Sequence, residues 1–450
     1  MGRLFGTDGV RGVANVHPMT VETALAIGRA TAYICRKRSN TRPTIVIGKD
    51  TRLSCDILES ALATGICSMG GNALLAGVLP TPGVAFITHS LWADAGMVVS
   101  ASHNPFEDNG IKIFSREGFK LPDSVENEIE DLIAPGKIGD APPTATEIGR
   151  MRRLNDAPER YIAFCKDTLH ENLDLSGLNI VLDCANGATY KTAPAVFRKL
   201  GANIECIHHS PDGTNINENC GSQHTGDLVA RVVESHANLG LAFDGDGDRL
   251  IAVDEKGNRL TGDHIMAICA RLYKDLGLLS NNMVIATVMS NFGFFAAMRN
   301  LGIETGISNV GDRYVLEMMQ EKNAVIGGEE SGHVIFLNHH TCGDGIITAL
   351  QLLWAVLHYG QPLSELAKIM SLSPQRLINV TVCKKPPFEE IAALQDAIHA
   401  AEAELGDRGR VLIRYSGTQT MCRVMVEGPT TEMTDRIAGT LAETVRANIG

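Results

Sequence analysis

The sequence predicts an α/β protein made of three related α/β units and a smaller C-terminal α+β unit. Three segments share one pattern, in which a short β-branched apolar run ends in a turn-rich stretch and continues as a helix: residues 44–50, 179–187 and 283–291. Such runs are typical of buried strands that lead into helices. Their recurrence at intervals of roughly 100 residues or more indicates a repeated unit with a mixed sheet.

The length of 450 residues corresponds to about three domains, and four small ones fit equally well. Breaks are predicted at a stretch rich in Pro and Gly (133–143), after an apolar run (250–254) and at a linker (371–374). The last part has its own elements, a helix at 391–405, a strand at 410–414 and a helix at 432–449. The predicted domains are 1–153, 154–254, 255–370 and 371–450.

Composition excludes several classes of protein. The net charge of −12, with no Lys/Arg-rich run that reverses it locally, disfavours binding to nucleic acid and to anionic membranes. No apolar run approaches the ~18 residues that cross a bilayer, and the N-terminus lacks a signal peptide, so we expect a cytoplasmic protein. The eleven cysteines are scattered without a C-x-x-C pair, which favours reduced thiols over disulfides or zinc.

Residues 96–105 form an apolar strand that ends in small and polar residues before a proline. Ser102 would lie just past the strand end, where α/β proteins place their ligands. A serine turn that only caps the next element is the alternative interpretation. The segment alone does not decide between them.

Three carboxylates alternate with glycines at Asp244, Asp246 and Asp248. Glycine allows the backbone to bend so that like charges converge on a hard cation, and without a cation this arrangement would be costly. A calcium EF-hand is excluded because Arg249 occupies the position that needs glycine and because the flanks are predicted to be strands. Three protein carboxylates leave coordination sites open, which suits Mg²⁺ shared with a phosphate oxygen.

Three further segments are compatible with sugar or phosphate binding, although ordinary polar turns explain each of them about as well. In 327–333, Glu329 and Ser331 can point the same way and hydrogen-bond neighbouring hydroxyls. Segment 414–423 has a loop of small residues bracketed by two arginines, which suits a phosphate. Near the N-terminus, 5–12 is rich in glycine, with Arg11 as the expected anion contact.

Taken together and in this order, the five motifs closely resemble the α-D-phosphohexomutase superfamily over nearly the whole chain. The resemblance implies four domains around a central cleft, one phosphosugar substrate and one Mg²⁺ in each active site. It implies that Ser102 is a phosphoserine that carries the phosphoryl group. The metal ligands would then be Asp244, Asp246, Asp248 and an oxygen of the Ser102 phosphate.

The same match extends to the other motifs. Substrate contacts are expected from Arg11, Glu329, Ser331 and His333. The distal phosphate is expected to be bound by Arg414, Ser416, Gly417, Thr418 and Arg423. Arg249 and Lys112 are expected to stabilise the transferring phosphoryl group. His103 and Lys112 are the candidates for the general base, and Arg249 is less suited because its pKa is too high.

The amino-acid sequences of segments 5–12 and 327–333 are typical of superfamily members that act on glucosamine phosphates. Glucose or mannose phosphates are the alternative substrates. A serine-dependent metallophosphatase and a sugar-phosphate sensor without chemistry are the other classes considered. One departure is that Gln419 and Thr420 replace the usual Glu-Pro of the phosphate loop, which affects its rigidity more than its donors. Whether the chain forms a homodimer stays open.

Overall fold

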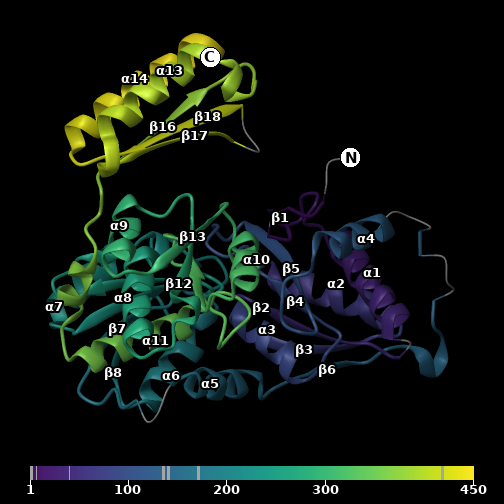
Figure 1. Cartoon of the computed structure of the whole chain (residues 1–450). Coiled ribbons are helices and arrows are strands. Elements are labelled where there is room, and N and C mark those ends of the chain that lie inside the picture. Colours follow the sequence, from purple (N-terminus) through teal and green to yellow (C-terminus); the bar gives the residue numbers. More distant parts are fainter. Residues whose placement is uncertain are drawn as a thin grey trace. The chain divides into compact units, whose positions relative to one another are not determined.

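Four β-sheets organise the chain, and each contains one of the strands predicted above (Figure 1). The computed structural model describes residues 4–6, 8–39, 41–133, 137–138, 142–169, 173–416 and 420–450. The chain divides into two units, a larger one of Met1–Met289 with Ile303–Lys368 and a smaller one of Ser290–Gly302 with Ile369–Gly450. The first three sheets lie in the larger unit and the fourth in the smaller one.

The first sheet has six strands in the order β1-β5-β4-β2-β3-β6. Central β2 runs parallel to β3 and β4, and β5 returns antiparallel to β4. The strands are β1 Val10–Val13, β2 Thr44–Lys49, β3 Asn72–Val78, β4 Ala95–Val99, β5 Asp108–Ser115 and β6 Met151–Arg153. The helices are α1 Val21–Ser39, α2 Cys55–Ser68, α3 Thr81–Ser90 and α4 Asp123–Ile133. Because β4 is buried along its whole length, its sequence is a continuous apolar run.

The second sheet has the order β11-β10-β9-β7-β8 and repeats the pattern of the first. Central β7 is parallel to β8 and β9, and β10 returns antiparallel to β9. The strands are β7 Asn179–Asp183, β8 Asn203–Ile207, β9 Leu239–Phe243, β10 Leu250–Asp254 and β11 Arg259–Leu260. The helices are α5 Ala157–Asp167, α6 Thr192–Lys199 and α7 Gly226–Ser235.

The third sheet, β13-β12-β14-β15, has the same topology. Central β12 is parallel to β13 and β14, and β15 returns antiparallel to β14. The strands are β12 Met283–Thr287, β13 Glu304–Ser308, β14 Ile326–Gly328 and β15 Val334–Phe336. The helices are α8 Gly262–Asp275, α10 Asp312–Lys322, α11 Gly345–Tyr359 and α12 Leu363–Leu366. The repeat predicted from strand spacing is therefore confirmed by three sheets of matching topology.

The smaller unit is built on an antiparallel sheet, β16-β18-β17. Its strands are β16 Gln375–Thr381, β17 Arg410–Tyr415 and β18 Met421–Glu427, and its helices are α9 Phe292–Asn300, α13 Ala392–Leu405 and α14 Thr431–Ile449. Helix α9 groups with this unit, although it follows β12 in the sequence. The buried carboxylate of Glu427 accepts hydrogen bonds from Asn291 Nδ2 and Phe292 N at 3.0 and 3.1 Å, which explains the association.

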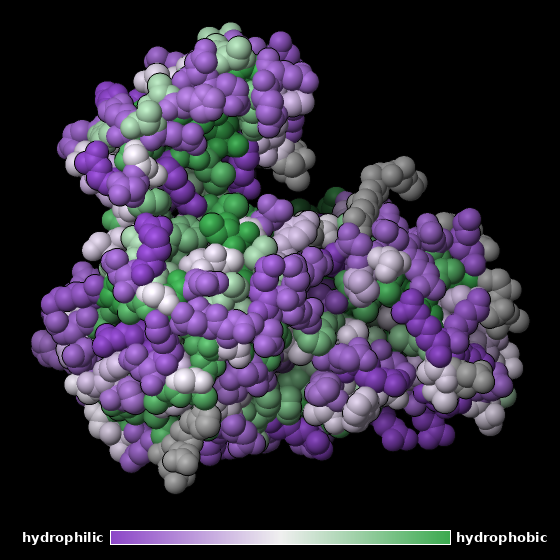
Figure 2. All heavy atoms as spheres, in the orientation of Figure 1, coloured by the Kyte–Doolittle hydropathy of each residue, from purple (hydrophilic) through white to green (hydrophobic). Residues whose placement is uncertain are grey.

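Polar side chains cover much of the face shown in Figure 2, and its hydrophobic residues form small separate patches. Within the described ranges, none of the helices combines the length and the apolar composition that crossing a bilayer requires. All eleven cysteine thiols are free, in agreement with their scattered positions in the sequence.

Helices α1 and α2 pack closely because glycine occupies their crossing. A Cβ atom added at Gly28 would lie 2.4 Å from the carbonyl oxygen of Leu62, closer than packing allows. We therefore expect Gly28→Ala to lower the free energy of unfolding by about 1–3 kcal/mol, since the backbone of α2 must shift. Denaturant unfolding of the purified variant measures this. Gly226→Ala, in the same unit with nothing within 4 Å, is the matched control; equal stabilities of the two variants would contradict the prediction.

Candidate active site

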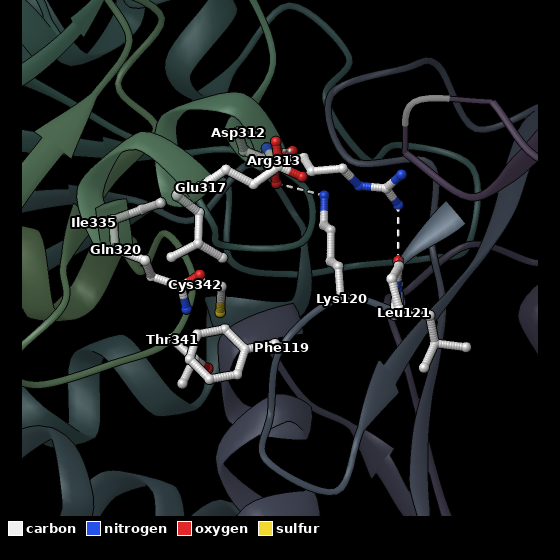
Figure 3. A pocket seen from close by; sticks show the side chains of 12 residues that line it. Phe119, Lys120, Leu121, Asp312, Arg313, Glu317, Gln320, Ile335, Thr341 and Cys342 are labelled. Atoms are coloured by element: carbon white, nitrogen blue, oxygen red, sulfur yellow. Dashed lines mark hydrogen bonds and ion pairs between the residues drawn. The ribbon is translucent and has the colours of Figure 1, made fainter. Parts of the chain in front are cut away.

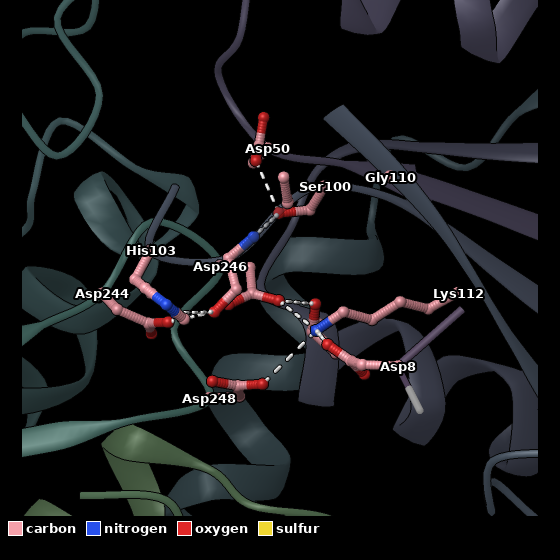
Figure 4. Close-up of polar contacts among 12 residues, drawn as sticks. Asp8, Asp50, Ser100, His103, Gly110, Lys112, Asp244, Asp246 and Asp248 are labelled. Atoms are coloured by element: carbon pink, nitrogen blue, oxygen red, sulfur yellow. Dashed lines mark hydrogen bonds and ion pairs between the residues drawn. The ribbon is translucent and has the colours of Figure 1, made fainter. Parts of the chain in front are cut away.

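The three predicted metal ligands lie on the loop between β9 and β10, which confirms strands on both flanks. Asp244, Asp246 and Asp248 are buried, and one oxygen of each lies within 4.8 Å of the others (Figure 4). The loop turns at Gly247, whose φ of 75° favours glycine. A Cβ at Gly245 would come within 2.5 Å of the carbonyl oxygen of Ser102. Glycine therefore allows the two loops to touch.

Ser102 lies in the loop between β4 and β5, just past the strand end as predicted. Its side chain is buried, and Oγ donates a hydrogen bond of 2.6 Å to Asp244 Oδ2. The residue has a φ of +52°, the left-handed region that non-glycine residues rarely adopt. Nδ1 of His103 lies 3.4 Å from Ser102 Oγ. The structure thus brings the predicted nucleophile directly to the predicted metal ligands.

Two donors hold one side of Asp246. Thr81, at the start of α3, donates from Oγ1 to Asp246 Oδ2 at 2.7 Å, and Lys112 Nζ donates to the same oxygen at 2.9 Å. The other oxygen, Oδ1, is buried and has no hydrogen-bond partner among the described residues, and the same holds for Oδ1 of Asp248. Buried carboxylate oxygens without partners are the ligands that a hard cation requires. The donor set therefore fits a Mg²⁺ ion.

The pKa values of the triad reflect the crowding of like charges. Burial, with repulsion by Asp248 and Asp246, raises the pKa of Asp244 well above its usual range. Burial also opposes the charge of Asp246 and of Asp248, but interactions dominated by Lys112 outweigh it and hold both pKa values below the usual range. Lys112 thus favours the charged forms of Asp246 and Asp248, whereas Arg249 and the Ser102 hydrogen bond offset only part of the repulsion on Asp244.

Lys112 lies on β5, opposite Val98 of β4 in the register. Its side chain is 2% exposed, and Nζ lies 2.9, 3.2 and 3.5 Å from Asp246, Asp8 and Asp248, respectively (Figure 4). Burial opposes its charge, but these carboxylates raise the pKa of Lys112 well above its usual value. For His103, burial and then Arg249 lower the pKa to about 4. The lysine is therefore a cation and the imidazole is neutral at pH 7.

A cavity of about 450 Å³ opens beside the triad. Of the predicted residues, the following line it: Arg11, His103, Asp248, Arg249, Glu329 and His333. Its remaining polar side chains are those of Asp8 and Asp312. Its size suits a small polar ligand, and its lining of guanidinium, imidazole and carboxylate groups can bind phosphate and hydroxyls.

The β14–β15 loop supplies Glu329, Ser331 and His333 to the site, as the sequence predicts. Glu329 Oε1 accepts from Gly311 N at 2.9 Å, and its Oε2 accepts from Ser331 Oγ at 3.4 Å. His333 is buried with its Nδ1 3.6 Å from Asp248 Oδ2. Burial opposes its charge, but Asp248, Asp312 and Glu329 raise its pKa. The surroundings therefore favour the charged form of an imidazole close to the triad.

Several residues of the site escape sequence reasoning. Asp8 pairs with Arg11, Lys112 and Lys120, and Lys120 pairs in turn with Asp312 of α10. Figure 3 shows Lys120 pointing to Asp312 at the edge of a second, smaller cavity. Asp8 lies within the N-terminal glycine motif, which offered a signal. Lys120 and Asp312 are isolated charged residues, and no sequence motif around either of them indicates a role in the site.

The predicted phosphate loop belongs to the smaller unit. Arg414 of β17 and Arg423 of β18 face one another in the antiparallel register. Burial and the charge of Arg423 lower the pKa of Arg414, so a bound anion would relieve repulsion between the two cations. Ser416 is buried, and its carbonyl accepts from Lys385 Nζ at 2.6 Å. Gly417 and Thr418 lie outside the described residues.

Family comparisons agree with this geometry. Models of phosphoglucomutase/phosphomannomutase match the whole set of domains: alpha/beta/alpha domain I at residues 2–137, II at 159–257, III at 261–372, and the C-terminal domain at 377–444. The chain belongs to the phosphoglucomutase/phosphomannomutase family, and the superfamily resemblance seen in its motifs is confirmed. A relative from Syntrophus aciditrophicus (strain SB), named phosphoglucosamine mutase, is 57% identical over 450 residues, which cover 100% of both chains.

Two solved structures share the fold. A phosphoglucomutase/phosphomannomutase family protein from Burkholderia thailandensis has a TM-score of 0.81 at 22% identity, covering 99% of both chains. N-acetylphosphoglucosamine mutase from Aspergillus fumigatus, in complex with GlcNAc-6P and magnesium, has a TM-score of 0.67 at 18% identity. That match covers 99% of this chain and 95% of the fungal one. The four-domain α/β architecture is therefore that of the phosphohexomutases.

Proposed function

We propose that the protein is a phosphosugar mutase that interconverts glucosamine 6-phosphate and glucosamine 1-phosphate. The observation that carries this proposal is the buried hydrogen bond from Ser102 Oγ to Asp244 within a triad of carboxylates. A nucleophile so placed can receive and donate a phosphoryl group beside a metal ion. The choice of sugar rests on the phosphoglucosamine mutase relative, which matches along the entire chain.

One Mg²⁺ would be held by Asp244, Asp246, Asp248 and, once Ser102 is phosphorylated, by an oxygen of its phosphate. When bound there, the ion would withdraw negative charge from the phosphoryl group. The magnesium present with the fungal N-acetylphosphoglucosamine mutase supports this assignment.

In the forward direction, the free hydroxyl of glucosamine 6-phosphate attacks the phosphorus of phosphorylated Ser102. A bond forms between phosphorus and the sugar oxygen and the bond to Ser102 Oγ breaks. Of the two candidate bases, His103 takes the hydroxyl proton, because the raised pKa of Lys112 leaves that side chain already protonated. Lys112 and Arg249 stabilise the equatorial oxygens during transfer. The product of this step is a bisphosphate.

The bisphosphate must then turn end for end, so that its other phosphate returns to Ser102 and glucosamine 1-phosphate leaves. Glu329 and Ser331 would bind the sugar hydroxyls in both orientations, assisted by Arg11 and His333. The distal phosphate would bind Arg414, Ser416, Gly417, Thr418 and Arg423. A cytoplasmic location stays a prediction from the sequence, and whether the chain forms a homodimer stays open.

Removal of the Ser102 hydroxyl tests the phosphoryl carrier. We expect Ser102→Ala to lower mutase kcat by on the order of 10³-fold or more, because no side chain can then carry the phosphoryl group. Peptide mass mapping of the wild type should find one phosphate on Ser102. Ser60→Ala, at an exposed serine of α2, is the control and should keep full activity. Wild-type rates in Ser102→Ala would rule out the proposed carrier.

Substrate preference tests the proposed sugar. We expect kcat/KM to be at least about tenfold higher for glucosamine 6-phosphate than for glucose 6-phosphate or mannose 6-phosphate. The physical reason is that Glu329 lines the cavity and accepts hydrogen bonds from Gly311 N and Ser331 Oγ, so its carboxylate can also accept from an amino group of the sugar. Side-by-side initial rates measure the ratio. A preference for glucose or mannose phosphates would favour the alternative members of the family.

Metal removal tests the carboxylate triad. We expect excess EDTA to abolish mutase activity and Mg²⁺ to restore it, since Asp246 and Asp248 each present an oxygen that accepts no hydrogen bond from the described residues. Asp248→Asn should raise the Mg²⁺ concentration needed for half-maximal activity by about tenfold or more. Asp227→Asn, at an exposed carboxylate of α7, provides the control. Full activity in EDTA would contradict the metal assignment.

A further inference from the structure

Both backbone polar groups of Ser102 are tied to one buried ion pair. Ser102 N donates to Ser100 Oγ at 3.0 Å, and Ser100 Oγ donates to Asp50 Oδ2 at 2.6 Å. Arg52 Nε lies 3.0 Å from Asp50 Oδ2, and Arg52 Nη2 donates to the carbonyl oxygen of Ser102 at 2.9 Å. These contacts close a ring of four residues, which we call the Ser102 ring. Figure 4 shows Asp50 and Ser100 meeting above the triad.

The Ser102 ring is shielded from water. Its four residues are at most 2% exposed, and Asp50 also accepts a hydrogen bond from Arg52 N at 2.9 Å. In a dry environment, a charge that loses its partner is strongly penalised, so the ion pair is difficult to open. This matters because Ser102 has the unfavourable left-handed conformation (φ +52°), which persists only where the surroundings enforce it.

A second clamp comes from the domain that carries the metal loop. Asn217 Nδ2 lies 2.9 Å from the carbonyl oxygen of Ser102 and 2.9 Å from that of Asn104. Arg52 Nη2 donates to the same two oxygens, also at 2.9 Å. Two carbonyl groups of the loop are therefore held from the first domain by a guanidinium and from the second by an amide. Asn217 is itself buried and fixed by a hydrogen bond from its N to Ala185 O at 2.9 Å.

We propose that Arg52 and Asn217 are positioning residues for phosphoryl transfer. They hold the carbonyl groups of Ser102 and Asn104, so that Ser102 Oγ stays directed at Asp244 throughout the reaction. Neither residue lines the substrate cavity. This inference rests on the proposed function. It predicts that loss of either residue slows phosphoryl transfer and changes substrate binding little. Misplacement of a reacting atom by about 1 Å costs up to ~10²-fold in rate.

Asn217→Asp is the sharpest test. The substitution keeps the shape of the side chain but replaces the two donated hydrogen bonds with repulsion between oxygens. We expect kcat to fall by about 10- to 100-fold while KM stays within about twofold of wild type. The ³¹P resonance of phosphorylated Ser102 should be shifted, broadened or weakened. Asn215→Asp removes an amide donor in the same loop, where it bonds to Ser210 O, and should behave as wild type.

Arg52→Lys provides the second variant, because it keeps the positive charge beside Asp50 but loses the fork that reaches the carbonyl groups. The same kcat and ³¹P changes are expected. If this variant does not fold, as judged by circular dichroism and thermal melting, Asn217→Asp decides alone. Wild-type kcat, a rise in KM at unchanged kcat, or an unchanged ³¹P resonance in Asn217→Asp would overturn the inference. Failure of the wild-type protein to convert any of the three sugar phosphates would instead overturn the proposed function.

Discussion

Repulsion among three buried carboxylates is the constraint around which the active site is built. Asp244, Asp246 and Asp248 can share one loop only because cations and donors from other elements offset their charges. Lys112 from the first sheet and Thr81 from the start of α3 supply part of this compensation within the protein. They leave two buried oxygens without hydrogen-bond partners and a carboxyl with a raised pKa, and these groups form the proposed metal site.

The repeated topology explains how three separate motifs come to serve one site. In each of the first three sheets, the motif follows the third parallel strand and precedes the antiparallel return: β4–β5 carries Ser102, β9–β10 the carboxylates, and β14–β15 Glu329. Three copies of one turn thus carry the proposed phosphoryl carrier, the proposed metal-binding loop and the proposed sugar-binding loop. The scaffold is shared, and the chemistry differs only in the loop residues.

Much of the fold and of the candidate site could be predicted because the sequence patterns that indicate them are local. Strands near residues 44, 179 and 283 appear as short apolar runs, and the Asp-Gly-Asp-Gly-Asp motif indicates metal binding within five consecutive residues. The supporting residues could not be predicted in this way. Arg52, Asn217, Lys120 and Asp312 act through contacts with residues 50 or more positions away in the sequence, and no local pattern marks them. The left-handed backbone of Ser102 is likewise imposed by tertiary contacts.

Helix α9 shows that sequence order and packing divide the chain differently. It follows the central strand of the third sheet, yet Glu427 of β18 holds its first turn. A recombination point placed in the linker near residue 371 would therefore separate Asn291 from the carboxylate that binds it, even though the break falls between compact bodies. The C-terminal segment and α9 consequently form one packing unit, and an exchange that takes both pieces from the same parent keeps the contact between Asn291 and Glu427.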